Sequence, residues 1–188
     1  MDEPQQFEAF MRAYQDMVFG TAMRLLGDFA EAQDIAQEVF LKAHVHFASL
    51  SQSPTAGGWL KTVSRNLSLN HLTRHRARWR PFSDLARPGE EDSDPLAKLP
   101  APDLSAEHWD SEARHGWVES GLALLPAVQR VPLVLYHFEE LSYEAIAEQL
   151  NISLSKVKTD IHRGRQALRR HLTRAPLRPE GMVPETPA

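Results

Sequence analysis

Residues 141–163 read LSYEAIAEQL, NIS and LSKVKTDIHR. Two helical patterns lie on either side of the short turn at 151–153, and Ser142 and Ser153 are candidate N-caps for them. After the turn, apolar residues recur at the spacing of one helical stripe: Leu154, Val157, Ile161, Leu168 and Leu172. Two helices joined in this way, the second apolar on one face and basic on the other, predict a helix-turn-helix that enters the major groove of DNA.

The charge of the second helix has mostly one sign. From Leu154 to Arg174 there are seven lysines and arginines and one acid, Asp160. The alternative is an ordinary amphipathic helix with a solvated charged face, but such a face usually mixes signs. The pattern therefore favours a DNA-binding helix.

The composition excludes several classes of protein. The chain has 188 residues, 42% of them hydrophobic, and no cysteine, which excludes disulfides, a thiol nucleophile and cysteine-based zinc sites. The N-terminus Met1-Asp2-Glu3-Pro4 does not resemble a signal peptide. No apolar run approaches the roughly 18–20 residues that cross a bilayer, so we expect no membrane insertion and a cytoplasmic protein.

The net charge of −4 conceals a segregated pattern. Residues 1–41 carry eight acids and two bases, residues 61–80 carry six bases and no acid, and residues 81–112 carry nine acids and two bases. The helix at the C-terminal end is basic again. Two basic patches separated by an acidic strip predict two contacts with one polyanion.

The expected fold class is all-α, with two small helical domains and a flexible acidic linker. The domains are predicted at 4–80 and 111–174, the Pro-rich linker at 81–110 and a disordered tail at 175–188. In the first domain, Gly27-Asp28 should end the first helix, a second helix should span about 31–47, a loop 49–58, and a third helix 59–79. In the second domain, Pro132 predicts a kink or a restart.

One large apolar side chain is predicted on a solvent face. At 100° per residue, Leu41 lies opposite the buried stripe of the second helix, flanked by Asp34, Gln37 and Glu38. An aliphatic side chain ringed by polar groups is typical of a protein-binding hot spot. A stray exposed leucine is the alternative, and geometry alone does not separate the two.

The third helix carries the first basic patch. Its candidate DNA-contacting residues are Lys61, Arg65, Asn66, Asn70, Arg74, Arg76 and Arg78. Basic side chains follow phosphates, and asparagine can read base edges. His71 and His75 have the i, i+4 spacing of metal ligands but no glutamate at the HExxH position. With no nucleophile–base arrangement or phosphate loop, we expect neither an enzyme nor a cofactor.

Three segments resemble a known family. EAQDIAQEVFLKA at 31–43 looks like the polymerase-binding helix of the extracytoplasmic-function sigma factors of the sigma-70 family, and GWLKTVSRNL at 58–67 resembles their promoter-melting helix. Leu125-Pro126, Gln129-Arg130, residues 141–144 and residues 157–163 resemble their minus-thirty-five reader. The resemblance covers about 5–80 and 112–172, in the family's order.

The resemblance implies a transcription initiation factor. Its expected partners are core RNA polymerase, through the largest and second-largest subunits, promoter DNA and an anti-sigma factor. By similarity, Asp34, Gln37, Glu38 and Leu41 face the polymerase, and the third-helix residues meet the minus-ten element. The implied minus-thirty-five readers are Ser155, Lys156, Lys158, Thr159, Asp160, His162 and Arg163.

Three residues depart from the family's pattern, one of them Gln33, which replaces a usual acid in the polymerase-binding helix. Asp160 stands where a basic residue is more usual, and an acid there can accept from cytosine N4 or repel a phosphate. Gly164 costs about 1 kcal/mol relative to alanine inside a helix, which indicates close approach of a neighbour. The competing function is a stand-alone helix-turn-helix regulator, which leaves the basic helix at 61–80 and the exposed Leu41 without a role.

Overall fold

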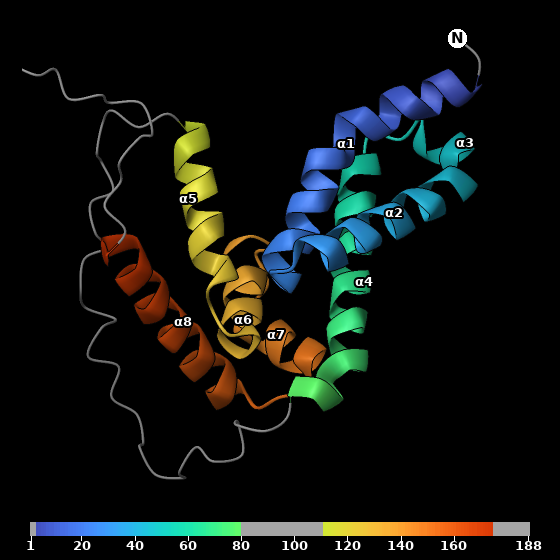
Figure 1. Ribbon diagram of the computed structural model, residues 1–188. Helices are drawn as coiled ribbons and strands as arrows, with labels where there is room; N and C mark the ends of the chain where they lie inside the picture. Colours follow the sequence, from blue (N-terminus) through green and yellow to red (C-terminus); the bar gives the residue numbers. More distant parts are fainter. Residues whose placement is uncertain (1–2, 80–110, 175–188) are drawn as a thin grey trace, which may run out of the picture. The chain divides into compact units, whose positions relative to one another are not determined.

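A computed structural model describes residues 3–79 and 111–174, with side chains for 3–74 and 116–173. These residues form eight helices and no strand, which confirms the all-α fold class for the described part of the chain (Figure 1). The helices are α1 Glu3–Leu26, α2 Phe29–Val45, α3 Phe47–Leu50, α4 Ala56–Trp79, α5 Ser111–Ala123, α6 Ala127–His137, α7 Tyr143–Leu150 and α8 Leu154–Arg174. The predicted linker at 81–110 and tail at 175–188 lie outside the described residues.

The chain divides into two compact units, Met1–Gly116 and Trp117–Ala188. In the first unit, α1, α2 and α4 pack against one another. The turn between α1 and α2 is formed as predicted: Gly27 adopts φ 67°, which glycine tolerates without steric cost. Asp28 then caps α2, its carboxylate accepting from the Glu31 amide at 3.0 Å.

The core of the first unit comes from apolar stripes on its three long helices. Its buried members are Val18, Ala22, Leu26, Ala32, Ile35, Val39, Phe40, Ala43, Leu50, Ala56 and Leu60. One buried polar contact joins α4 to α1, because the Ser64 hydroxyl donates to the Val18 carbonyl at 3.0 Å. The stripe of α2 that the sequence predicts to be buried consists of Ala32, Ile35, Ala36, Val39, Phe40 and Ala43. All of these residues are buried except Ala36, which is half-buried.

The predicted loop at 49–58 is shorter in the structure. Helix α3 extends to Leu50 and α4 begins at Ala56, three residues before the expected start. Gly57 lies inside α4 despite its low helix propensity, and a Cβ added there would lie 3.1 Å from the Tyr14 ring. Close packing of α4 on α1 at this glycine therefore outweighs its local loop signal.

The second unit is built on contacts among α6, α7 and α8. The predicted restart at Pro132 is wrong: α6 is continuous from Ala127 to His137. Every residue from Arg130 to Leu135 is buried, so packing outweighs the one backbone hydrogen bond that proline removes. The guanidinium of the buried Arg130 donates to the Leu125 carbonyl at 2.9 Å.

Helices α7 and α8 are each capped at the N-terminus by a serine. The Ser142 hydroxyl accepts from the Ala145 amide, and the Ser153 hydroxyl accepts from the Lys156 amide, each at 3.2 Å. Between them, Asn151 ends α7 in the left-handed conformation at φ 52°. Both serine caps predicted from the sequence are thus confirmed, and they fix where the two helices begin.

Gly164 lets α8 approach α6 closely. A Cβ added there would lie 3.0 Å from the Gln129 carbonyl oxygen, while one added at Gly116 of α5 would meet nothing within 4 Å. The close approach expected from the sequence is confirmed.

We predict that Gly164→Ala lowers the free energy of unfolding by about 1 kcal/mol, because crowding the Gln129 backbone outweighs the helix propensity that alanine gains. Gly116→Ala is the matched control and should raise it by up to about 1 kcal/mol. Urea unfolding of the full chain, followed by circular dichroism, checks both. Equal stabilisation by the two substitutions would contradict the prediction.

Candidate functional site

Helix α8 presents different residues on its two faces. Val157, Ile161 and Gly164 are buried against the second unit, at 0% and 1% exposure for the two side chains. Of the predicted minus-thirty-five readers, Ser155, Lys158, Thr159 and Arg163 are exposed, and Lys156 and His162 are half-buried. The N-terminal half of α8 therefore offers a polar, basic surface of the kind that enters a major groove.

Asp160 does not share the exposed face. Its side chain is only 5% exposed, and its carboxylate lies against the Lys156 ammonium, with Oδ2 at 3.1 Å and Oδ1 at 3.4 Å. Burial raises the pKa of the carboxyl, while Lys156 and the charge of Arg163 act to lower it. Asp160 thus lies among the inward-facing residues of α8, and its assignment to the minus-thirty-five surface stays a prediction.

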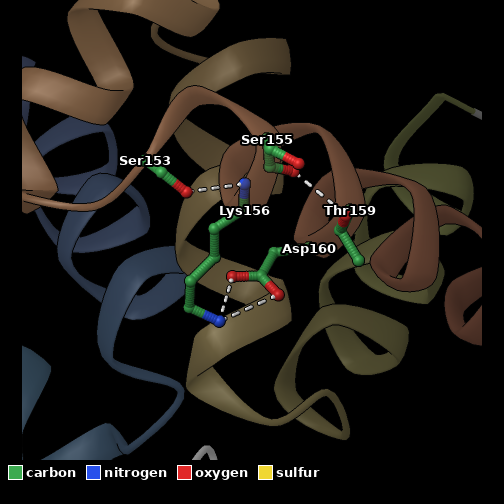
Figure 2. A network of polar contacts seen from close by, with 5 residues as sticks. All are labelled: Ser153, Ser155, Lys156, Thr159 and Asp160. Carbon is green, nitrogen blue, oxygen red and sulfur yellow. Dashed lines mark hydrogen bonds and ion pairs between the residues drawn. The ribbon is translucent and has the colours of Figure 1, made fainter. Parts of the chain in front are cut away.

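The other polar residues of the exposed face make contacts within α8. The Thr159 hydroxyl donates to the Ser155 carbonyl at 3.0 Å (Figure 2). His162 Nε2 lies 3.0 Å from the Gln166 amide nitrogen. Both contacts are exposed to solvent, so the Thr159 hydroxyl and the His162 ring remain accessible to a ligand.

Arg165 packs against its own unit, although the sequence places it on the basic face. Its Nε donates to His137 Nε2 at 3.2 Å, and its guanidinium carbon lies 5.3 Å from the centre of the Tyr136 ring. Tyr136 in turn packs on Tyr143 of α7, with ring centroids 4.8 Å apart. Sequence reasoning missed this cluster, because nothing in the local pattern pairs residues of α6 with α8.

Helix α4 holds the predicted minus-ten residues on two neighbouring stripes. Asn66, Asn70 and Arg74 are exposed at i, i+4 and i+8, while Lys61 and Arg65 are half-buried. The side chains of Arg76 and Arg78 lie outside the described ones. His71 Nε2 is 3.3 Å from Glu31 Oε1 of α2, so this histidine contacts an acid across the helix pair.

Helix α2 exposes the predicted protein-binding residues. Leu41 is 69% exposed, and Asp34, Gln37 and Glu38 are also exposed. Glu38 lies 3.6 Å from Lys42, a solvent-exposed pair. Val45, four residues after Leu41, is 78% exposed and was missed by the sequence analysis. Two aliphatic side chains one turn apart thus form a small apolar ridge with a polar border.

Neither a metal site nor a membrane span is found in the described part of the chain. No group of three or more histidine, cysteine or acidic side chains there could hold a metal ion. Among the same residues, no helix combines the length and the apolar character needed to cross a membrane.

Comparison with known families and sequences finds the same two units. The family described as Sigma-70 region 2 matches residues 10–78, and Sigma-70, region 4, matches residues 115–168. The ECF RNA polymerase sigma factor SigW of Bacillus subtilis (strain 168) is 31% identical over 167 residues, covering 88% of each chain. The RNA polymerase sigma-H factor of Pseudomonas aeruginosa is 32% identical over 86% of this chain and 83% of that protein.

Two further matches are less complete: one is to a longer protein, and the other is to a solved structure that superposes only in part. The ECF RNA polymerase sigma factor SigE of Mycolicibacterium smegmatis is 36% identical over 89% of this chain, which spans 62% of that longer protein. A co-crystal structure of the sigma factor RpoE with the anti-sigma factor NepR from Bartonella quintana covers 90% of this chain and 98% of that one, at 22% identity and a TM-score of 0.46. A likeness at this TM-score supports no conclusion about the site.

The contact between Arg165 and His137 makes stability depend on pH. Burial, and then the charge of Arg165, lower the pKa of His137 below its ordinary value of 6.5. The folded state thus prefers neutral His137, so stability should fall as pH drops through about 6.5 towards the lower folded pKa. We predict that His137→Gln, which keeps an acceptor for Arg165, loses less unfolding free energy between pH 7.5 and 5.5 than the unsubstituted protein. Identical losses would contradict this.

Proposed function

The chain belongs to the extracytoplasmic-function RNA polymerase sigma factors of the sigma-70 family, and from this premise we propose which of its surfaces meet the polymerase and the promoter. As a sigma factor, it directs RNA polymerase to promoters. A stand-alone regulator would not account for relatives that align along both units. What remains to be assigned is the role of individual side chains.

The exposed N-terminal half of α8 reads the minus-thirty-five element. The observation that carries this assignment is the division of α8, which buries Val157 and Ile161 and exposes Lys158, Thr159 and Arg163. Recognition helices contact base edges mainly through their N-terminal residues. Ser155, Lys156 and His162 border this surface and complete it.

The exposed stripe of α4 meets the minus-ten element. Asn66 and Asn70 present amides one helical turn apart, and Arg74 continues the stripe. Amides can bond to base edges, while arginine and lysine contact phosphates. Resemblance to the family adds four basic residues to this surface. Two of them, Lys61 and Arg65, lie on the adjacent half-buried stripe, and the side chains of the other two, Arg76 and Arg78, lie outside those described.

The ridge of Leu41 and Val45, with Asp34, Gln37 and Glu38, binds core polymerase. An aliphatic pair that remains exposed beside a complete core has no role in folding its own unit. Apolar groups surrounded by polar ones are typical of binding hot spots. The largest subunit is the partner proposed for this ridge, with the second-largest subunit contacting the chain elsewhere.

Three further proposals follow from family membership. Sigma factors are non-enzymatic initiation factors, and we extend this to the present chain, which would use no cofactor. We place it in the bacterial cytoplasm with its polymerase. An anti-sigma factor is the expected regulator of its activity.

Leu41→Asp should abolish association with core RNA polymerase, because a carboxylate replaces the apolar anchor of the ridge. Run-off transcription with purified core polymerase on a library of randomised promoters, and competition for core binding, measure the effect. Leu124→Asp, at a leucine that is 65% exposed in the other unit, is the matched control and should retain core binding. Normal core binding by Leu41→Asp would remove the ridge from the interface.

Arg163→Ala should weaken minus-thirty-five recognition by about 1–3 kcal/mol if the guanidinium contacts a base, or reduce the salt slope by about one if it contacts phosphate. Arg170→Ala, two turns further along the same face, should change only the salt dependence. Promoter binding by the reconstituted holoenzyme across a salt series separates the two results. A promoter assay indifferent to Arg163→Ala would exclude it from the reading surface.

A further inference from the structure

Lys156 is held at both ends. Its backbone amide donates to the Ser153 hydroxyl at 3.2 Å (Figure 2). Its ammonium donates to Oδ1 of the nearly buried Asp160 at 3.4 Å and forms an ion pair with Oδ2 at 3.1 Å. Lysine side chains otherwise carry much rotamer freedom. The ammonium of Lys156 therefore occupies a defined position on α8.

Helix stability does not account for this ion pair. Lys156 is the third residue of α8, where the helix dipole disfavours a cation, and a lysine that precedes its acid by four residues is the weaker orientation. Burial raises the pKa of Asp160, which shows that its charge is kept at a desolvation cost. A neutral side chain would fill the same position without that cost.

The location of the pair indicates what it does. At about 100° per residue, Thr159 lies near the centre of the exposed face, while Lys156 lies at its edge, between Arg163 and Asp160. We propose that Asp160 is a positioning residue, which holds the Lys156 ammonium at the edge of the DNA-reading surface and does not itself contact DNA. This inference rests on the proposed role of α8.

Two consequences follow for DNA recognition. A fixed ammonium acts as a directed donor, so Lys156 contributes to the choice of base sequence. A paired ammonium is also neutralised, so it adds little to the salt-dependent attraction of phosphates. Removing the Asp160 charge should therefore raise salt dependence and lower selectivity together.

The test uses the full chain reconstituted with core polymerase. Asp160→Asn, nearly isosteric, should increase the slope of promoter binding against salt by about one and reduce minus-thirty-five selectivity by roughly fivefold, measured on a randomised minus-thirty-five library. Asp160→Glu, which retains the charge, should preserve the slope. A purely structural role would change neither the slope nor the preferred sequence.

A second substitution shows whether Asp160 acts through Lys156. Lys156→Gln should cause the same loss of selectivity, and adding Asp160→Asn to it should reduce the selectivity no further. If Asp160→Asn still alters the preferred sequence in that background, Asp160 reads DNA directly and the proposal fails. A silent Lys156→Gln overturns it as well, and this holds even if Asp160→Asn does not fold.

The outcome at Arg163 separates this inference from the proposed function. If Arg163→Ala alters promoter selection while the Asp160 and Lys156 variants are silent, only the positioning role is wrong. If all three are silent, α8 is not the reading helix.

Discussion

The close contact between α8 and α6 is the constraint on which the DNA-facing surface depends. Gly164 brings the recognition helix against the Gln129 backbone, and Val157 and Ile161 are buried on the same side. Because these residues fix the rotation of α8 about its axis, they also determine which side chains point outward. The buried apolar stripe of α8 thus determines which side chains form the proposed DNA-reading surface. A substitution in the stripe that rotates the helix would also change that surface.

Much of the fold could be predicted because its signals are local. Ser142 and Ser153 cap their helices, and the first helix ends at Gly27-Asp28, as the sequence indicates. The exposure of Leu41 also followed from helical periodicity. Each of these features depends on residues within a few positions of one another, which is the range over which sequence patterns are informative.

The predictions that failed concern positions whose conformation depends on packing against residues distant in the sequence. Gly57 lies in α4 where that helix packs on the Tyr14 ring, and Pro132 is tolerated because α6 is buried around it. Asp160 is a different case: by helical angle it lies near the edge of the inward face of α8, and it is nearly buried and paired with Lys156, four residues away. Helical angle places a side chain only to within tens of degrees, which is too coarse to assign a face at such an edge.

The formal charge of α8 overstates its strength as a polycation. Lys156 is compensated by Asp160, and Arg165 is engaged by His137 and the Tyr136 ring. The effective valence that this helix offers to phosphates is therefore smaller than its sequence implies, and its attraction to arbitrary duplex DNA is correspondingly weaker. A factor of this kind is less readily sequestered by the large excess of unrelated genomic sites, which favours its availability to RNA polymerase.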